Sequence, residues 1–149
     1  MRIESREPQN FPTPFGELKF EAATSLWFQQ NASYEIEVAI GGSAAGPSQH
    51  AVQFAERLLP LLNPLARAGR EYLDEFVKKD GFEEEAEWYL EGLLLEAPPV
   101  TSPDHFGLCF THAGDIYGYW TVVFRKLAEH ELRILKVAAW PIAFQREQT

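Results

Sequence analysis

The chain has 149 residues, 46% of them hydrophobic and 23% charged, a composition typical of one folded domain and unlike that of a disordered segment. Its formal net charge of −9 argues against binding nucleic acid or an anionic membrane surface through basic residues. The single cysteine excludes an intrachain disulfide, and no apolar run reaches the ~18 residues of a membrane span. We therefore expect one cytoplasmic domain over residues 1–149, with no membrane and no nucleic acid among its partners.

The first third of the chain predicts an extended arm followed by a meander of strands. Residues 1–14 contain three prolines, which favour extended geometry, and they lack the apolar core of a signal peptide. Residues 16–21 alternate polar and apolar side chains, as a half-buried strand does, and residues 25–29 are a second candidate. The clearest strand covers residues 34–40, with Tyr34, Ile36, Val38 and Ile40 on one face.

The middle of the chain predicts three helices. The first follows the glycine-rich segment 41–46, with Pro47 as its first residue and apolar residues at three- and four-residue steps up to Leu62. Pro60 should kink or end this helix, and Asn63-Pro64 should start a second one that ends at Asp80-Gly81. The apolar face of the second helix would carry Tyr72, Leu73, Phe76 and Val77.

A third helix is expected from Glu83 to Glu96, and its buried face would carry Ala86, Tyr89, Leu90, Leu93 and Leu94. The last third of the chain returns to strand patterns, at residues 106–111, 120–124 and 132–139. The order of strands, helices and strands predicts an α+β fold, with an antiparallel sheet of about five or six strands and three helices packed on one face. The expected core includes Phe20, Ile36, Val38, Leu59, Phe76, Leu90, Phe110, Val122 and Phe124.

The residues that could carry chemistry form no recognised motif. None of the four histidines has a zinc-binding spacing, so we expect no metal and no cofactor. His112 and Asp115 lie three apart across a predicted turn, with His105 at the other end of the same strand. Such a pair can orient a general base, although an aspartate in a turn often bonds its own backbone. Cys109 is either a small buried hydrophobe or a nucleophile beside His112. The segment 41–46 is a flexible connection or an anion site, although it lacks the ending of a phosphate loop.

Acidic residues gather in one part of the chain. Residues 70–91 hold nine acidic and three basic side chains. Helix-dipole and intrahelical pairing effects explain several of these acids, but neither explains Glu87 or Glu91. An aromatic residue among acids suits an interface, so the candidate partner-binding residues are Glu84, Glu87, Trp88 and Glu91. The alternative is a merely solvated acidic face, with Trp88 covering the edge of the core.

Two stretches resemble a group of known proteins. The opening F-G-x-L-x-F at residues 15–20 and the T-H-A-G-D-I-Y-G-Y-W-T-V-V-F at residues 111–124 resemble small uncharacterised bacterial α+β families associated with toxin immunity. Where such families often carry a glycine–histidine pair in the final sheet, this chain has Gly118-Tyr119. The resemblance implies no catalytic residues. It implies a non-enzymatic immunity protein that neutralises a secreted toxin by direct binding, and the acidic surface of this chain favours a basic toxin or effector. The alternative is a small-ligand binder or hydrolase that uses His105, His112 and Asp115.

Overall fold

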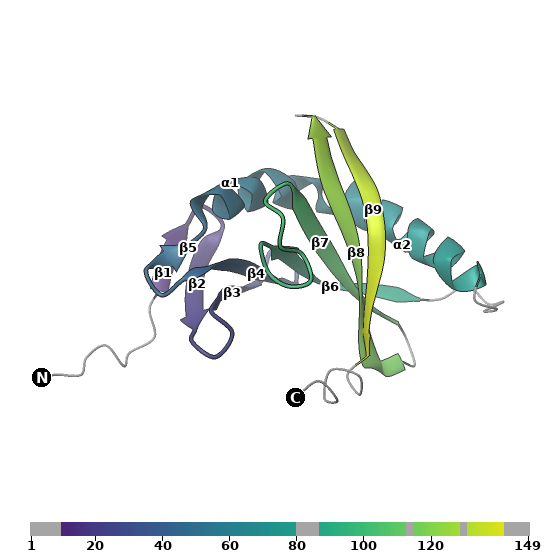
Figure 1. Ribbon diagram of the computed structural model, residues 1–149, viewed down its shortest axis with the longest axis horizontal. Coiled ribbons are helices and arrows are strands. Elements are labelled where there is room, and N and C mark those ends of the chain that lie inside the picture. The colour runs from purple at the N-terminus through teal and green to yellow at the C-terminus, as the bar shows by residue number, and fades with distance from the viewer. Residues whose placement is uncertain (1–9, 80–86, 113–114, 129–130, 142–149) are drawn as a thin grey trace, which may run out of the picture.

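The computed structural model describes residues 10–79, 87–112, 115–128 and 131–141, which form a mixed β-sheet with one helical segment packed on it (Figure 1). The strands are β1 (Asn10–Thr13), β2 (Gly16–Glu21), β3 (Leu26–Asn31), β4 (Ile36–Ser43), β5 (Gly46–Pro47), β6 (Trp88–Leu95), β7 (His105–His112), β8 (Asp115–Ala128) and β9 (Glu131–Pro141). The helical segment consists of α1 (Gln49–Leu58), the 3₁₀ turn η2 (Leu59–Leu61) and α2 (Leu62–Lys79).

The sheet joins two antiparallel meanders through one parallel pair. Its strand order is β1-β2-β3-β4-β6-β7-β8-β9, with β5 paired to β4. Each neighbouring pair is antiparallel except β4 and β6. A parallel pair requires a crossover connection, and here the helical segment supplies it. The expected antiparallel sheet of five or six strands with three helices is therefore wrong.

The expected third helix is wrong because residues 88–95 form strand β6. The pairing of β6 with β7 contains a β-bulge between Leu90 and Gly92. Glu91 is the extra residue of this bulge and pairs with no residue of β7. The bulge places Leu90 and Leu93 on the same face three residues apart, which imitates the spacing of a helix. The beginning of the expected helix, residues 83–86, lies outside the described residues.

The helical segment differs from the expectation at its joints. Helix α1 begins at Gln49, after Ser48, whose Oγ accepts a hydrogen bond from the amide of Ala51. Pro60 lies in η2, so the chain passes directly into α2, and Asn63-Pro64 occupies the first turn of α2 instead of capping a separate helix. Within the described part of the chain, neither helix is long and apolar enough to cross a bilayer.

The core lies between the helical segment and one face of the sheet. It confirms the expected burial of Ile36, Val38, Leu59, Phe110, Val122 and Phe124, while Phe20 and Leu90 are partly buried against it. In the centre the rings of Phe106 and Phe124 stack with their centroids 4.8 Å apart. Three expected positions are wrong, because Tyr34, Tyr72 and Tyr89 are exposed. The side chains of Phe76 and Val77 lie outside those that the structure describes.

The packing of α2 on the sheet can be tested at Gly69. A Cβ atom at this position would lie 2.9 Å from Cζ of Phe110, whose side chain is fully buried. Replacing glycine by alanine inside a helix normally stabilises it by about 1 kcal/mol, whereas overpacking a core costs about 1–3 kcal/mol. We expect Gly69→Ala to lower the free energy of unfolding measured by urea denaturation.

The Phe110→Leu background is the control, because the shorter side chain makes room for the added methyl group. In that background we expect Gly69→Ala to be neutral or stabilising, with a coupling energy of about 1 kcal/mol or more between the two substitutions. Additive effects of the two substitutions would contradict this packing of α2 on β7.

Candidate functional site

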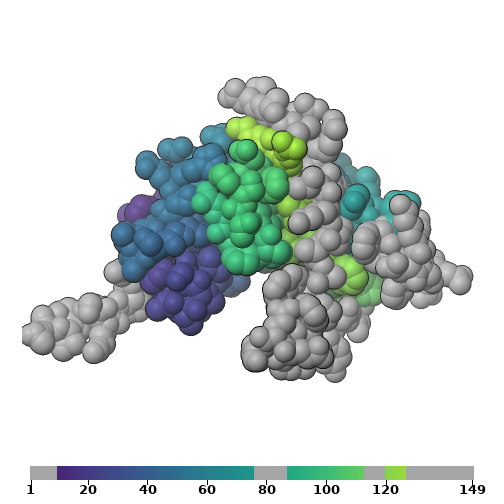
Figure 2. Space-filling model, viewed as in Figure 1, coloured from purple at the N-terminus to yellow at the C-terminus, as the bar shows by residue number. Residues whose placement is uncertain are grey.

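A loop covers only part of the sheet face that lies opposite the helices. Helices α1 and α2 pass behind the sheet in Figure 1, and the connection between β6 and β7, residues 96–104, lies in front of it. The same connection stands at the centre of the space-filling view (Figure 2). Val100 is buried over Gly107, where an added Cβ atom would lie 2.8 Å from Cγ2 of Val100. We call the part of this face that the loop leaves uncovered the open face.

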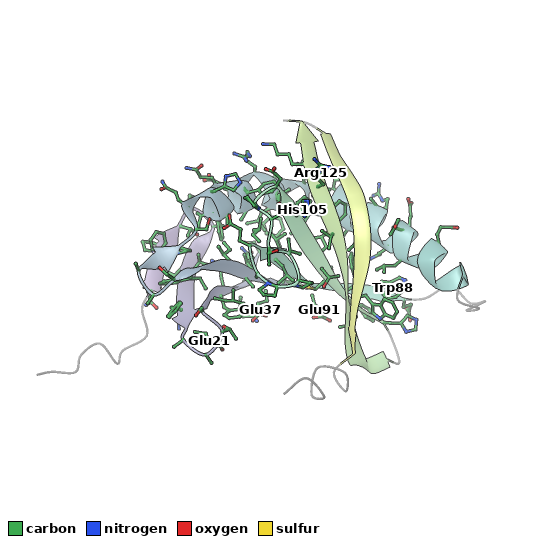
Figure 3. All side chains as sticks on the ribbon, in the orientation of Figure 1. Glu21, Glu37, Trp88, Glu91, His105 and Arg125 are labelled. Atoms are coloured by element: carbon green, nitrogen blue, oxygen red, sulfur yellow. The ribbon has the colours of Figure 1, made fainter. Side chains whose placement is uncertain are left out.

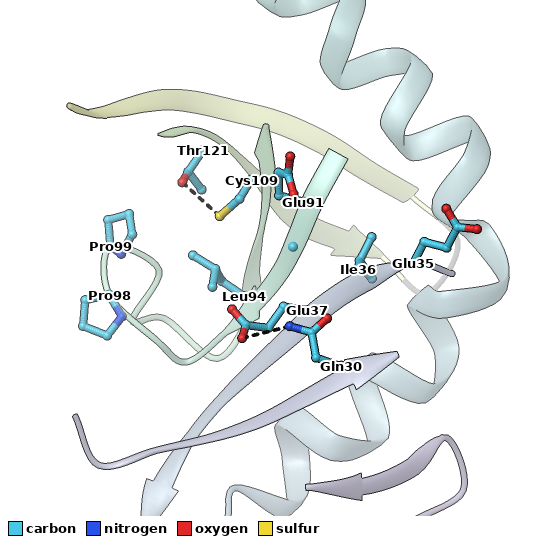
Figure 4. A pocket seen from close by; sticks show the side chains of 11 residues that line it. Gln30, Glu35, Ile36, Glu37, Glu91, Leu94, Pro98, Pro99, Cys109 and Thr121 are labelled. Carbon is cyan, nitrogen blue, oxygen red and sulfur yellow. Dashed lines mark hydrogen bonds between the residues drawn. The ribbon is translucent and has the colours of Figure 1, made fainter. Parts of the chain in front are cut away.

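The open face contains a hollow whose floor follows one row across five strands. Strand pairing places Gln30 beside Glu37, Glu37 beside Gly92, Gly92 beside Cys109, and Cys109 beside Thr121. Because Gly92 has no side chain, the row is interrupted at its centre, and a cavity of about 510 Å³ opens there (Figure 4). The lining residues are Gln30, Glu35, Ile36, Glu37, Glu91, Gly92, Leu94, Pro98, Pro99, Cys109 and Thr121.

Carboxylates give the hollow its charge. Glu35, Glu37 and Glu91 line it, and among the described residues that line it there is no lysine, arginine or histidine. Glu37 Oε2 accepts a hydrogen bond from Gln30 Nε2 at 3.4 Å, and Glu91 Oε2 accepts one from Thr111 Oγ1 at 2.8 Å. Desolvation by burial raises the pKa of Glu37, the charge of Glu21 raises it further, and the bond from Gln30 lowers it. The hollow is thus acidic, with one carboxylate held in an environment that disfavours its charge.

The floor of the hollow is polar but neutral. Cys109 Sγ lies 3.4 Å from Thr121 Oγ1, and Thr121 is almost fully buried. Burial raises the pKa of the Cys109 thiol to about 11; the bond to Thr121 lowers it, and the charges of Glu37 and Glu91 raise it. A thiol with this pKa is protonated at neutral pH, which disfavours the interpretation of Cys109 as a nucleophile.

The three predicted partner-binding residues that the structure describes lie just before β6 or within it, and not on a helix. Glu84 lies outside the described residues, Glu87 is exposed, and Glu91 is exposed at the rim of the hollow. Trp88 is buried, with its indole nitrogen donating to Asp74 Oδ1 at 3.0 Å and its ring packed edge-on against Trp120. Trp88 therefore packs in the contact between α2 and the sheet. A role of Glu84, Glu87, Trp88 or Glu91 in binding a partner stays a prediction.

The predicted histidine site is split between the two ends of β7. His105 begins this strand and His112 ends it, which separates them by roughly 23 Å at 3.3 Å per residue. In Figure 3, His105 lies beside Arg125 and far from Trp88, the partner of His112 in the β6–β7 register. Asp115 pairs with His112 across the turn, as expected, but its side chain is outside those described. The two histidines therefore cannot act on one substrate atom.

Two further expectations concern ion sites. The segment 41–46 belongs to the pairing of β4 with β5, so it is a hairpin and not a loop that opens directly into a helix. Among the described residues, no group of three or more histidine, cysteine, aspartate or glutamate side chains is placed to hold a metal ion.

Sequence reasoning missed the hollow. It placed Gly92 inside a helix. The available signal was Gly92 itself, which interrupts a run of large apolar residues from Leu90 to Leu95. Comparisons with protein-family models, curated proteins and solved structures found no match to this chain. The role of the hollow is therefore inferred from its own residues.

The protonated state of Cys109 can be tested by alkylation with iodoacetamide at pH 8. With a pKa of about 11, roughly one thiol in a thousand is ionised at that pH, against about one in ten for the ordinary value of 9.0. We expect the folded protein to react at least ~100-fold more slowly than the urea-unfolded chain, with N-acetylcysteine measured in both solutions as the control. Equal rates for folded and unfolded protein would contradict the raised pKa of this half-buried thiol.

Proposed function

We propose that this protein is a non-enzymatic binding module, and that the hollow on its open face receives a basic segment of a partner protein. The observation that carries this proposal is the charge of the lining: of its eleven described residues, three are glutamates and none is basic. The glutamates come from separate segments: Glu35 precedes β4, Glu37 lies in β4 and Glu91 in β6. A partner that reaches all three must therefore contact both meanders of the sheet.

Electrostatics supports a basic partner. The chain carries a net charge of −9, so the acidic hollow lies in a molecule that attracts cations at long range. A concave surface lined by charge of one sign concentrates the field and speeds the encounter with an oppositely charged partner. Glu37 strengthens this inference, because a nearby positive charge would favour its ionised form against the cost of its burial.

The residues of the hollow support binding more than catalysis. A nucleophilic mechanism needs an activated nucleophile next to a base, and the part of the lining that the structure describes contains no histidine. Its thiol has a pKa of about 11. The histidines considered as an alternative site lie at opposite ends of β7. The alternative of a hydrolase built jointly on His105 and His112 therefore lacks the required proximity.

The kind of partner follows from the resemblance of residues 15–20 and 111–124 to families associated with toxin immunity. We infer that the partner is a basic toxin and that this protein neutralises it by stoichiometric binding. A protein that only blocks another needs surface complementarity and fast association, and it needs no catalytic groups. The acidic open face meets that requirement.

Charge reversal in the hollow provides the main test. We expect a tagged protein to co-purify with one basic protein in a stoichiometric complex, and Glu37→Lys with Glu91→Lys to abolish its retention. The same charge change at the exposed helical residues Glu56 and Glu71 is the matched control, and it should leave the partner bound. Expression of the isolated partner should arrest growth, and co-expression of the wild-type protein should restore it.

Two results would contradict the proposal. Loss of the partner in the Glu56→Lys, Glu71→Lys variant but not in the hollow variant would place recognition on the helices. Retention by both variants would mean that the hollow does not contribute to binding. Circular dichroism and urea denaturation of each variant should be measured first, so that loss of binding is separated from loss of folding.

The side chain of Glu37 is exposed, but partial desolvation raises its pKa, which predicts that its charge is unfavourable for stability. The pKa of Glu37 is higher in the folded protein than the ordinary value of 4.5, which the unfolded chain has. As the pH rises above 4.5, the unfolded state therefore gains more from ionisation, and the free energy of unfolding falls. We expect Glu37→Gln to raise the urea midpoint at pH 7 and to change it less at pH 4. Glu56→Gln is the exposed control. An equal or lower midpoint for Glu37→Gln at pH 7 would show that the burial of this carboxylate has no cost.

A further inference from the structure

We propose that the hollow is specific for an arginine side chain of the partner, with the guanidinium group between Glu37 and Glu91. This inference rests on the proposed function and names the chemistry of its contact. The place for the side chain exists because of Gly92, which lies beside Glu37 in the parallel pair and follows Glu91 in β6. Glu37 and Glu91 thus flank the one position in the row that has no side chain (Figure 4).

Both carboxylates keep free acceptor capacity. Each accepts one side-chain hydrogen bond, from Gln30 and from Thr111 respectively. An ionised carboxylate has about four acceptor sites, so several remain on each group. A guanidinium group carries five N–H donors in a planar fork and can bond two carboxylates at once. The compact ammonium group of lysine has three donors and forms no such fork.

The walls of the hollow suit the rest of an arginine side chain. Leu94 and the two prolines, Pro98 and Pro99, provide apolar surface at one side of it. The methylene groups of arginine pack along apolar surface while the charged end reaches polar groups. Guanidinium is also more weakly hydrated than ammonium, so it enters a partly dry site at a lower desolvation cost. The hollow combines these apolar walls with paired carboxylates.

The loop that carries the wall is held in place by contacts outside the hollow. The side chain of Glu96, at the start of this loop, accepts a hydrogen bond from Ser48 Oγ at 2.9 Å. Val100 donates its amide to the carbonyl of Ala97 at 2.7 Å and is buried. The Nε2 atom of His50 lies 3.0 Å from the carbonyl oxygen of Pro103. These contacts fix the loop before any partner arrives, which lowers the ordering cost of binding.

The test uses N-acetyl-argininamide as the probe and the ¹⁵N-labelled protein as the receptor. We expect saturable chemical-shift changes at the amides of Gly92, Cys109 and Thr121, with a dissociation constant on the order of 1–10 mM, as for one exposed charged contact. The citrulline analogue, which has the same shape without the charge, should cause none. The lysine analogue should bind at least about fivefold more weakly, because it cannot bridge both carboxylates.

Matched variants decide whether the hollow is the site. Glu37→Gln with Glu91→Gln should weaken binding of the arginine probe at least about tenfold, since both charge-assisted hydrogen bonds are lost. Glu56→Gln with Glu71→Gln, which removes the same charge from the helices, should leave binding unchanged. Amide signals away from the hollow should keep their positions in all variants, which shows that the fold is intact.

The possible results separate this inference from the proposed function. Absence of saturable shifts, equal binding of citrulline or lysine, or binding that survives Glu37→Gln with Glu91→Gln would overturn the arginine assignment. If the charge-reversed hollow variant still loses the partner protein in that case, the proposed function stands and only the arginine contact fails. If the probe binds as expected but partner retention is unaffected by charge reversal, the hollow is an arginine site that the partner does not use, and the proposed function fails.

Discussion

The parallel pairing of β4 with β6 is the constraint on which the rest of this structure depends. Without it the chain would be two separate meanders, each with an unpaired edge. The pairing requires a long crossover, and the helical segment from Gln49 to Lys79 provides it. The crossover covers one face of the sheet with α1 and α2, and the apolar residues of both meanders face it. Which face is buried and which stays open are both decided by this one connection.

The open face shows how a binding site can arise from small residues. At Gly107 the missing side chain is replaced by Val100 from the loop, and the sheet is closed there. At Gly92 the nearest atoms to an added Cβ would be the carbonyl oxygen of Glu37 at 3.1 Å and Cβ of Cys109 at 3.8 Å, with no atom of the loop among them, and the hollow remains. Two glycines on adjacent strands thus have opposite consequences because the loop reaches only one of them. The acids around Gly92 then give the space an acidic lining.

Local features of the sequence were predictable, and long-range ones were not. Neighbouring residues determine the alternation in β2 and β4 and the helical period of α1. The sequence therefore predicted those elements close to their observed positions. Strand β6 was mistaken for a helix, because the bulge at Glu91 breaks its alternation. The hollow depends on residues from Gln30 to Thr121 that meet only through strand pairing. No pattern along the chain could show that Glu37 and Gly92 are neighbours.

The row from Gln30 to Thr121 also links occupancy of the hollow to the folding equilibrium. Gln30 and Glu37 belong to the first meander, whereas Gly92, Cys109 and Thr121 belong to the second. A ligand held across this row binds only when the two halves are assembled, so mass action shifts the chain toward the folded state. At a free concentration of a hundred times its dissociation constant, such a ligand adds about 2.7 kcal/mol of stability. Binding of the proposed partner would therefore stabilise the sheet to which it binds.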